Sequence, residues 1–150
     1  MSSPTHVEMD REAMEEFLAS TGLGTLSFGG DGGYGVPMSF GYDRRDDRCL
    51  FQFLDLPESE KLDRLADDPR VTLSVFEVTG TDEWRSVLVH GELTRLGPTV
   101  GSRAATVFAR NAEVPSLQMF GGPIDHDDLV WYELDVERMS GRESPGRDEG

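Results

Sequence analysis

The spacing of hydrophobic positions changes along the chain, and each spacing predicts a different element. Between residues 11 and 20 apolar side chains recur every three or four positions, which predicts a helix capped by Asp10 and ended by Gly22. From Leu23 onward apolar and polar residues alternate, as on strands with one buried face. This alternation predicts six strands, over residues 23–28, 34–42, 49–54, 71–75, 84–96 and 129–139.

Short connections between these strands limit the possible folds. Two more helices are predicted, one over about 58–67 after Pro57 and one from Pro98 to about residue 112. Pro37 has no N–H to donate, so its strand is expected to lie at an edge or to be partly unpaired. Most connections are too short for a parallel crossover. The expected class is therefore α+β, with a mainly antiparallel six-stranded β-barrel and short flanking helices.

One domain is expected over residues 10–142, with a disordered N-terminus at 1–9 and a disordered acidic tail at 143–150. A chain of 150 residues can bury a core without disulfides or a structural metal. Cys49 is the only cysteine, so no intrachain disulfide can form. No apolar run approaches the length that a bilayer needs, and no signal-peptide pattern is present, so the expected location is the cytoplasm.

The charge balance bears on partners. The chain has 14 Lys and Arg against 29 Asp and Glu, a net charge of −15. Such a field repels nucleic acids and anionic membranes, so neither is expected as a partner. The acidic residues occur in nearly every segment, which is typical of a halophilic protein; an ordinary acidic protein is the alternative. Lys61 is the only lysine, which draws attention to what its ammonium group does.

Residues 57–63 combine a serine and this lysine at the predicted start of a helix. Free backbone N–H groups and the helix dipole favour anions there, and Ser59 and Lys61 could complete a phosphate site. The alternative is a capping serine followed by a solvated lysine that pairs with Glu58 or Asp63. A spacing of Ser-x-Lys does not by itself distinguish these two interpretations.

A second donor-bearing segment begins at Trp84, where Arg85 and Ser86 enter the predicted strand and could contact the same phosphate. The alternative is a strand start with an exposed cation and a half-buried tryptophan. Of the histidines, His90 is expected on a sheet surface and His126 in an acidic loop, so no metal site is predicted. No residue stands out as a general acid or base, and the catalytic residues stay unknown.

Several short segments occur in a characteristic order, namely residues 35–43, 50–53, 59–62, 69–71 and 84–91. In this order they resemble the pyridoxamine 5′-phosphate oxidase-like superfamily of FMN-binding split barrels, in its small nitroimidazole-resistance-like branch. The resemblance covers about residues 10–142 and includes the closing Met139-Ser140-Gly141-Arg142. It implies a split β-barrel and a homodimer with the flavin at its interface.

The resemblance also implies a set of cofactor-binding residues. One strand would lie beside the isoalloxazine, the next would end at the phosphate helix, and the Arg-Ser-Val segment would contact the phosphate and ribityl chain. A tryptophan on the last strand would reach the partner's flavin. In this sequence those residues are Met38, Ser39, Phe40, Gln52, Phe53, Ser59, Lys61, Arg85, Ser86, Val87 and Trp131.

The implied function is an FMN-dependent oxidoreductase that takes electrons from a small donor such as a reduced nicotinamide, with an unknown substrate. The end of the resemblance, Arg138 to Gly141, departs from the Arg-Leu-x-Pro-like end of vitamin B6 oxidases and argues against that activity. The alternatives are a non-catalytic module that stores or senses flavin, and a reductase that uses F420. Haem is a further possible cofactor of the same barrel.

Overall fold

The computed structural model describes residues 5–29, 33–54, 63–65, 68–111 and 129–145. Residues 63–65 are helical. The other elements, in chain order, are β1 (Val7–Glu8), α1 (Arg11–Ser20), β2 (Leu23–Phe28), β3 (Tyr34–Ser39), β4 (Gly41–Asp43), β5 (Arg48–Leu54), β6 (Arg70–Gly80), β7 (Glu83–Gly97), α3 (Ser102–Asn111) and β8 (Leu129–Glu143).

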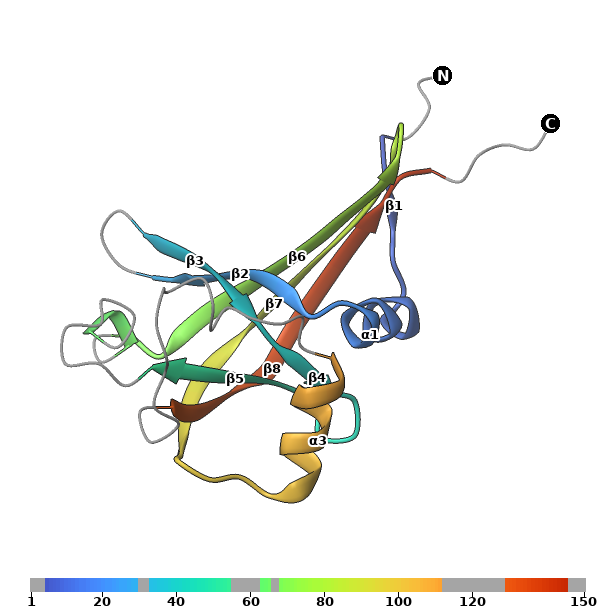
Figure 1. The fold of residues 1–150 in the computed structure, drawn as a ribbon. Coiled ribbons are helices and arrows are strands. Elements are labelled where there is room, and N and C mark those ends of the chain that lie inside the picture. The colour runs from blue at the N-terminus through green and yellow to red at the C-terminus, as the bar shows by residue number, and fades with distance from the viewer. Residues whose placement is uncertain (1–4, 30–32, 55–62, 66–67, 112–128, 146–150) are drawn as a thin grey trace.

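All these strands belong to one curled sheet. Its order is β3-β2-β6-β7-β8-β5-β4, with β1 added to β8, and every pair is antiparallel. The strands β3 and β4 lie at opposite ends of this order although only Phe40 separates them in sequence. The sheet therefore curls back on itself around the core (Figure 1). This arrangement confirms the predicted α+β class and the split β-barrel.

The strands differ from prediction in number and length. The predicted strand 34–42 divides at Phe40, whose N–H donates to the carbonyl of Gly22 at 3.0 Å. β6 and β8 run on to Gly80 and Glu143, well beyond the predicted ends at residues 75 and 139. Backbone pairing with β7 continues through both extensions, because ladder hydrogen bonds do not depend on which side chains a strand carries.

The sequence predicted disorder at residues 1–9 and from residue 143, and the structure describes residues 5–9 and 143–145 of these two segments. β1 pairs with the end of β8, Val7 opposite Glu143, and Met9 donates its N–H to the carbonyl of Gly141 at 2.9 Å. Met9 is buried, and its sulfur fills the space beside Gly141. Pairing to a free strand edge and burial of one methionine together hold this part of the chain.

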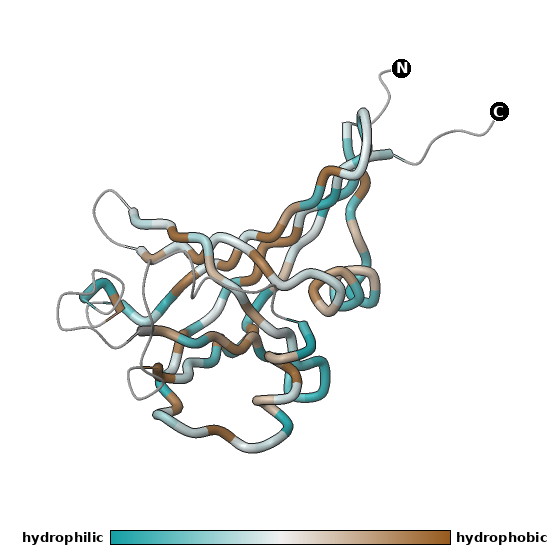
Figure 2. Tube along the Cα trace, in the orientation of Figure 1, coloured by the Kyte–Doolittle hydropathy of each residue, from teal (hydrophilic) through white to brown (hydrophobic). Residues whose placement is uncertain are grey.

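The helix α1 closes one end of the barrel. Its cap is as predicted, since the Asp10 carboxylate accepts a hydrogen bond from the N–H of Ala13 at 2.8 Å. Met14, Phe17 and Leu18 are buried against the sheet. Inside the barrel, aromatic rings pack on one another and on aliphatic residues of β2, β6 and β7. Along the strands in Figure 2, apolar and polar residues alternate as the sequence pattern requires.

The helix α3 covers the outer side of β4 and β5. It begins at Ser102, later than the predicted Pro98, and Ala104 is its buried residue. Gly41 allows the close approach of this helix, because a Cβ there would lie 2.7 Å from the Cα of Phe108. Phe108 meets Trp131 edge to face, with ring centroids 5.2 Å apart. None of the helices in the described part of the chain is long and apolar enough to span a membrane.

Candidate functional site

The strands β2, β3, β6, β7 and β8 share a face that points away from the core and carries many hydroxyl groups. The strand register places residues of this outer face in rows. One row is Pro37, Thr25, Ser74, Leu88 and Ser140, and the next is Gly35, Ser27, Thr72, His90 and Arg138. The residues between these rows along each strand, such as Leu26, Leu73 and Val89, are buried in the core.

Large apolar side chains are exposed at the end of this outer face near α1. Leu23 is 50% exposed, Phe76 70% and Leu88 39%. Phe76 lies directly opposite Ser86, and Ser86 lies opposite Arg142 on the next strand. An apolar surface beside a hydroxyl and an exposed guanidinium can contact a flat ring and an oxyanion together.

At the other end of the outer face is a groove of about 700 Å³. His90 lies in it with its Nδ1 atom 3.0 Å from the hydroxyl of Thr72. Burial lowers the pKa of His90, and the nearby Arg138 guanidinium lowers it further, so this imidazole is neutral at pH 7. Arg70 and Asp68, which form an ion pair with each other, also line the groove.

Two of the predicted cofactor residues, Ser39 and Ser86, lie on the outer face near the exposed apolar side chains. The neighbours of Ser86 point to the opposite side of the sheet, because side chains alternate along a strand. Val87 is fully buried in the core. The Arg85 guanidinium bonds to Glu77 at 2.7 Å and lies 4.8 Å from the ring centre of Phe17. A phosphate contact by Arg85 therefore stays a prediction.

Three other predicted residues have side chains that face the core. Phe40 and Phe53 are fully buried, and Met38 packs against the core. The rings of Phe53 and Tyr132 stack with centroids 4.5 Å apart. Any contact of Phe40 or Phe53 with a cofactor would run through their backbone groups, and the predicted role of all three side chains is untested. Ser59 and Lys61 lie outside the described residues.

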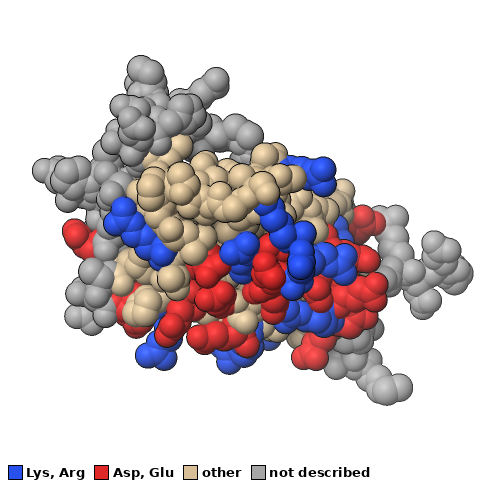
Figure 3. Space-filling view, turned by 90° about the horizontal axis from the view of Figure 1, so that it is seen from below, with Lys and Arg blue, Asp and Glu red and all other residues tan. Residues whose placement is uncertain are grey.

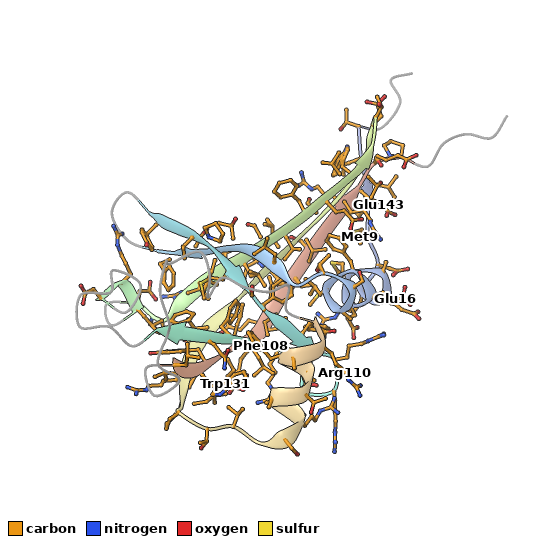
Figure 4. The ribbon with its side chains drawn as sticks, viewed as in Figure 1. Met9, Glu16, Phe108, Arg110, Trp131 and Glu143 are labelled. Atoms are coloured by element: carbon orange, nitrogen blue, oxygen red, sulfur yellow. The ribbon has the colours of Figure 1, made fainter. Side chains whose placement is uncertain are left out.

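Gln52 and Trp131 are neighbours across β5 and β8, and Trp131 also faces Gly97 of β7. Ser86 instead pairs with Arg142, near the far end of β8. Figure 4 shows this separation, with Trp131 beside Phe108 at one end of the strand and Glu143 at the other. Within one protomer the candidate residues therefore form two groups, at opposite ends of β8.

Sequence reasoning missed Arg142 as a site residue. The last strand was expected to end at residue 139, which left Arg142 in an irregular segment. Its position opposite Ser86 follows only from the continued pairing of β8 with β7. Strand alternation, extended by three residues, was the signal that could have placed it on the outer face.

A sequence model of the family described as pyridoxamine 5′-phosphate oxidase matches residues 10–143. No match was found among curated proteins.

Solved structures with the same fold come from several bacteria. An FAD-binding protein from Mesorhizobium loti has a TM-score of 0.75 and 21% identity, and the match covers 95% of this chain and 100% of that one. An FAD and heme binding protein from Mycobacterium smegmatis has a TM-score of 0.68 and 16% identity, over 95% of this chain and 75% of that one. An FAD binding protein from the same species has a TM-score of 0.65 and 16% identity, over 93% and 100%.

Proposed function

The chain belongs to the pyridoxamine 5′-phosphate oxidase family, and we propose on this basis that it is a flavin-binding protein whose cofactor is FMN. The observation that carries the proposal is the outer face near α1, where exposed Leu23, Phe76 and Leu88 adjoin Ser86 and Arg142. Two structural neighbours described as FAD-binding proteins support a flavin in general. The expected cellular location is still the cytoplasm.

The donor set on this face fits a flavin. The ring system of a flavin is flat and largely apolar, whereas its side chain carries hydroxyl groups and a phosphate. Leu23, Phe76 and Leu88 offer the apolar surface, and Ser86 and Arg142 offer donors for oxygen atoms. A bound flavin would supply hydride and electron transfer, and the protein would bind and orient it.

For the reaction, we propose an oxidoreductase that accepts electrons from a reduced nicotinamide or a similar small donor. The main alternative is a non-catalytic module that stores or senses flavin, and a further alternative is a reductase that uses F420. Haem also stays a candidate, because one structural neighbour is described as binding FAD and heme. Visible absorption spectra of the purified protein with each cofactor distinguish these possibilities, and oxidation of a reduced nicotinamide tests for turnover.

Replacing Lys61 or Ser86 by alanine is expected to weaken FMN binding. Each removes a hydrogen bond to a charged group, worth about 1.5–3 kcal/mol, so affinity should fall roughly tenfold to a hundredfold. Fluorescence titration with FMN measures the change. Ser20→Ala is the matched control, because that hydroxyl bonds only within α1, to the carbonyl of Phe17. Protein that stays colourless and unchanged in spectrum when FMN or FAD is added would contradict the proposal.

We further propose that two copies associate through the outer face, as a homodimer with the flavin at the interface. Exposed apolar side chains gathered on one sheet face are typical of a binding surface. A second copy could also bring Gln52 and Trp131 of one protomer close to Ser86 of the other, which the two ends of a single β8 do not allow.

Replacing Phe76 by aspartate is expected to dissociate this dimer. Losing an apolar anchor of an interface costs about 2 kcal/mol of association, roughly thirtyfold in the dissociation constant, and the new carboxylate would add to this cost. Light scattering after size exclusion measures the molar mass, and thermal unfolding checks that the variant is folded. Val7→Asp is the control, because Val7 is exposed but lies in the row of Glu143 and Arg85, on the opposite side of the sheet from Ser86 and Arg142. A folded Phe76 variant with the mass of the wild type would exclude this interface.

A further inference from the structure

A second pocket, of about 510 Å³, lies away from the outer face, between α3, β4 and the end of α1. Arg103, Thr106 and Arg110 line it from α3, at spacings of three and four residues that place them on one side of the helix. Phe108 points from α3 toward Trp131, and Arg110 points to the other side (Figure 4). Arg44 completes the basic lining from the end of β4.

The charge of this pocket is opposite to that of the chain. Three arginines and a single carboxylate, Asp43, line it, which gives +2 where the whole chain carries −15. In the view from below, Lys and Arg side chains lie at several places on the surface, interspersed with Asp and Glu (Figure 3). Repulsion from distant carboxylates is screened beyond about 10 Å at 0.1 M salt, so the local arginines dominate for a bound anion.

Asp43 does not neutralise the pocket by itself. Its side chain is fully buried and already bonded to Arg48 at 3.3 Å, to Arg103 at 2.7 Å and to the N–H of Arg45 at 3.2 Å. The hydrogen bond from Arg103 to Asp43 fixes one edge of the Arg103 guanidinium, while the other N–H groups of that guanidinium stay available. A buried carboxylate thus positions a basic side chain at the pocket wall.

The other two arginines of the pocket, Arg44 and Arg110, form few ion pairs. Arg44 has one ion pair, 3.6 Å from Glu15, and Glu15 also pairs with Arg11. Arg110 forms no ion pair with a carboxylate among residues 5–29, 33–54, 63–65, 68–111 and 129–145. The side chains of Ser102, Thr106 and Asn111 add neutral donors to the same lining.

We propose that this pocket binds a small phosphorylated metabolite through Arg44, Arg103 and Arg110. Guanidinium forks match the paired oxygens of a phosphate, and a net +2 matches a dianion better than a single carboxylate. A volume of about 510 Å³ exceeds what a phosphate alone fills, so it leaves room for an organic group against Val107 and Ala19. The site is separate from the proposed flavin site and does not depend on it.

The test is calorimetric titration with inorganic pyrophosphate in the presence of saturating FMN, at about 0.1 M salt, where the repulsion from distant carboxylates is screened. Arg110→Gln is the informative variant, because Arg110 supports no ion pair in the described fold. Its affinity for pyrophosphate should fall roughly tenfold to a hundredfold. The control is Arg45→Gln, which removes a nearby exposed cation that does not line the pocket. It should bind like the wild type.

Four outcomes would overturn the proposal, three with pyrophosphate and one with malonate. The wild type does not bind pyrophosphate, Arg110→Gln binds it like the wild type, or Lys61→Ala alone abolishes binding, which would place the anion at the proposed flavin phosphate site. Malonate serves as a dicarboxylate probe and should bind at least tenfold more weakly. If it binds as tightly as pyrophosphate, the pocket is a general anion site and the assignment to phosphate is wrong.

Discussion

An alanine at Gly91 is expected to lower the free energy of unfolding by about 3 kcal/mol or more, the upper end of what overpacking costs. Gly91 follows a shift in the pairing of β7 with β8, between His90 and Gly91. A Cβ at Gly91 would lie 1.9 Å from the backbone oxygen of Asp135 and 3.0 Å from the Leu134 side chain. A backbone oxygen cannot rotate away as a side chain can, so the two central strands would have to separate.

Urea unfolding of Gly91→Ala gives this difference directly as a shift of the midpoint. Gly101→Ala is the matched control, because nothing lies within 4 Å of a Cβ at Gly101. Its unfolding free energy should stay within about 0.5 kcal/mol of the wild type. If both variants unfold alike, β7 and β8 do not approach each other as closely as the structure shows.

Replacing Asp43 by asparagine is also expected to lower the free energy of unfolding by a large amount. The carboxylate of Asp43 is fully buried and accepts hydrogen bonds from Arg48, Arg103 and a backbone N–H. Removing its charge leaves Arg48, which is mostly buried, with only Glu133 and Asp46 as partners. Losing one partner of a buried pair costs up to about 5 kcal/mol, and we expect about 3 because Arg103 is half exposed and can turn to water.

This loss should depend on pH in a defined direction. Burial acts to raise the pKa of Asp43, but hydrogen bonds from Arg103 and Arg48 outweigh it, so the pKa is below its ordinary value. The stabilisation is therefore complete above the unfolded-state pKa of about 3.9 and is lost as the pH falls through the folded-state pKa. Urea unfolding between pH 7 and pH 3 should show the wild type approaching Asp43→Asn only at the acid end.

Asp135→Asn provides the control of opposite sign. Burial, and then the neighbouring charge of Glu133, raise the pKa of Asp135. Ionisation of this carboxyl opposes folding above its unfolded-state pKa, so Asp135→Asn should leave stability at pH 7 unchanged or slightly higher. If Asp43→Asn and Asp135→Asn lose the same stability at pH 7, the hydrogen bonds from Arg48 and Arg103 do not stabilise the charged form of Asp43.

Local signals in the sequence were sufficient to predict the helices and strands and the faces that they bury in the core. The Asp10 cap, the apolar face of α1 and the alternation on β2 and β7 all depend on residues a few positions apart. Asp43 instead falls in the loop between the predicted strands 34–42 and 49–54. Its burial depends on Arg103, which lies sixty positions later, and no spacing within the loop reveals that partner.

The candidate site was harder to predict, because it depends on which strands are neighbours. Gln52 lies beside Trp131 only because β5 pairs with β8, across most of the chain. The sequence alone could have shown that Ser86 faces the opposite side of the sheet from Arg85 and Val87, because adjacent residues of a strand point to opposite sides. A family resemblance assigns consecutive residues to one site, whereas the pleat allows only every second side chain to reach it.

The position of β8 in the sheet also determines when the barrel can form. β8 lies between β7 and β5, yet it comes last in sequence among the strands that the structure describes. During synthesis, the ribosome releases β2 to β7 before the strand that joins them exists, so β5 and β7 expose unpaired edges. Barrel closure therefore waits for β8, and a chain that stops short of residue 129 lacks the strand that joins β7 to β5.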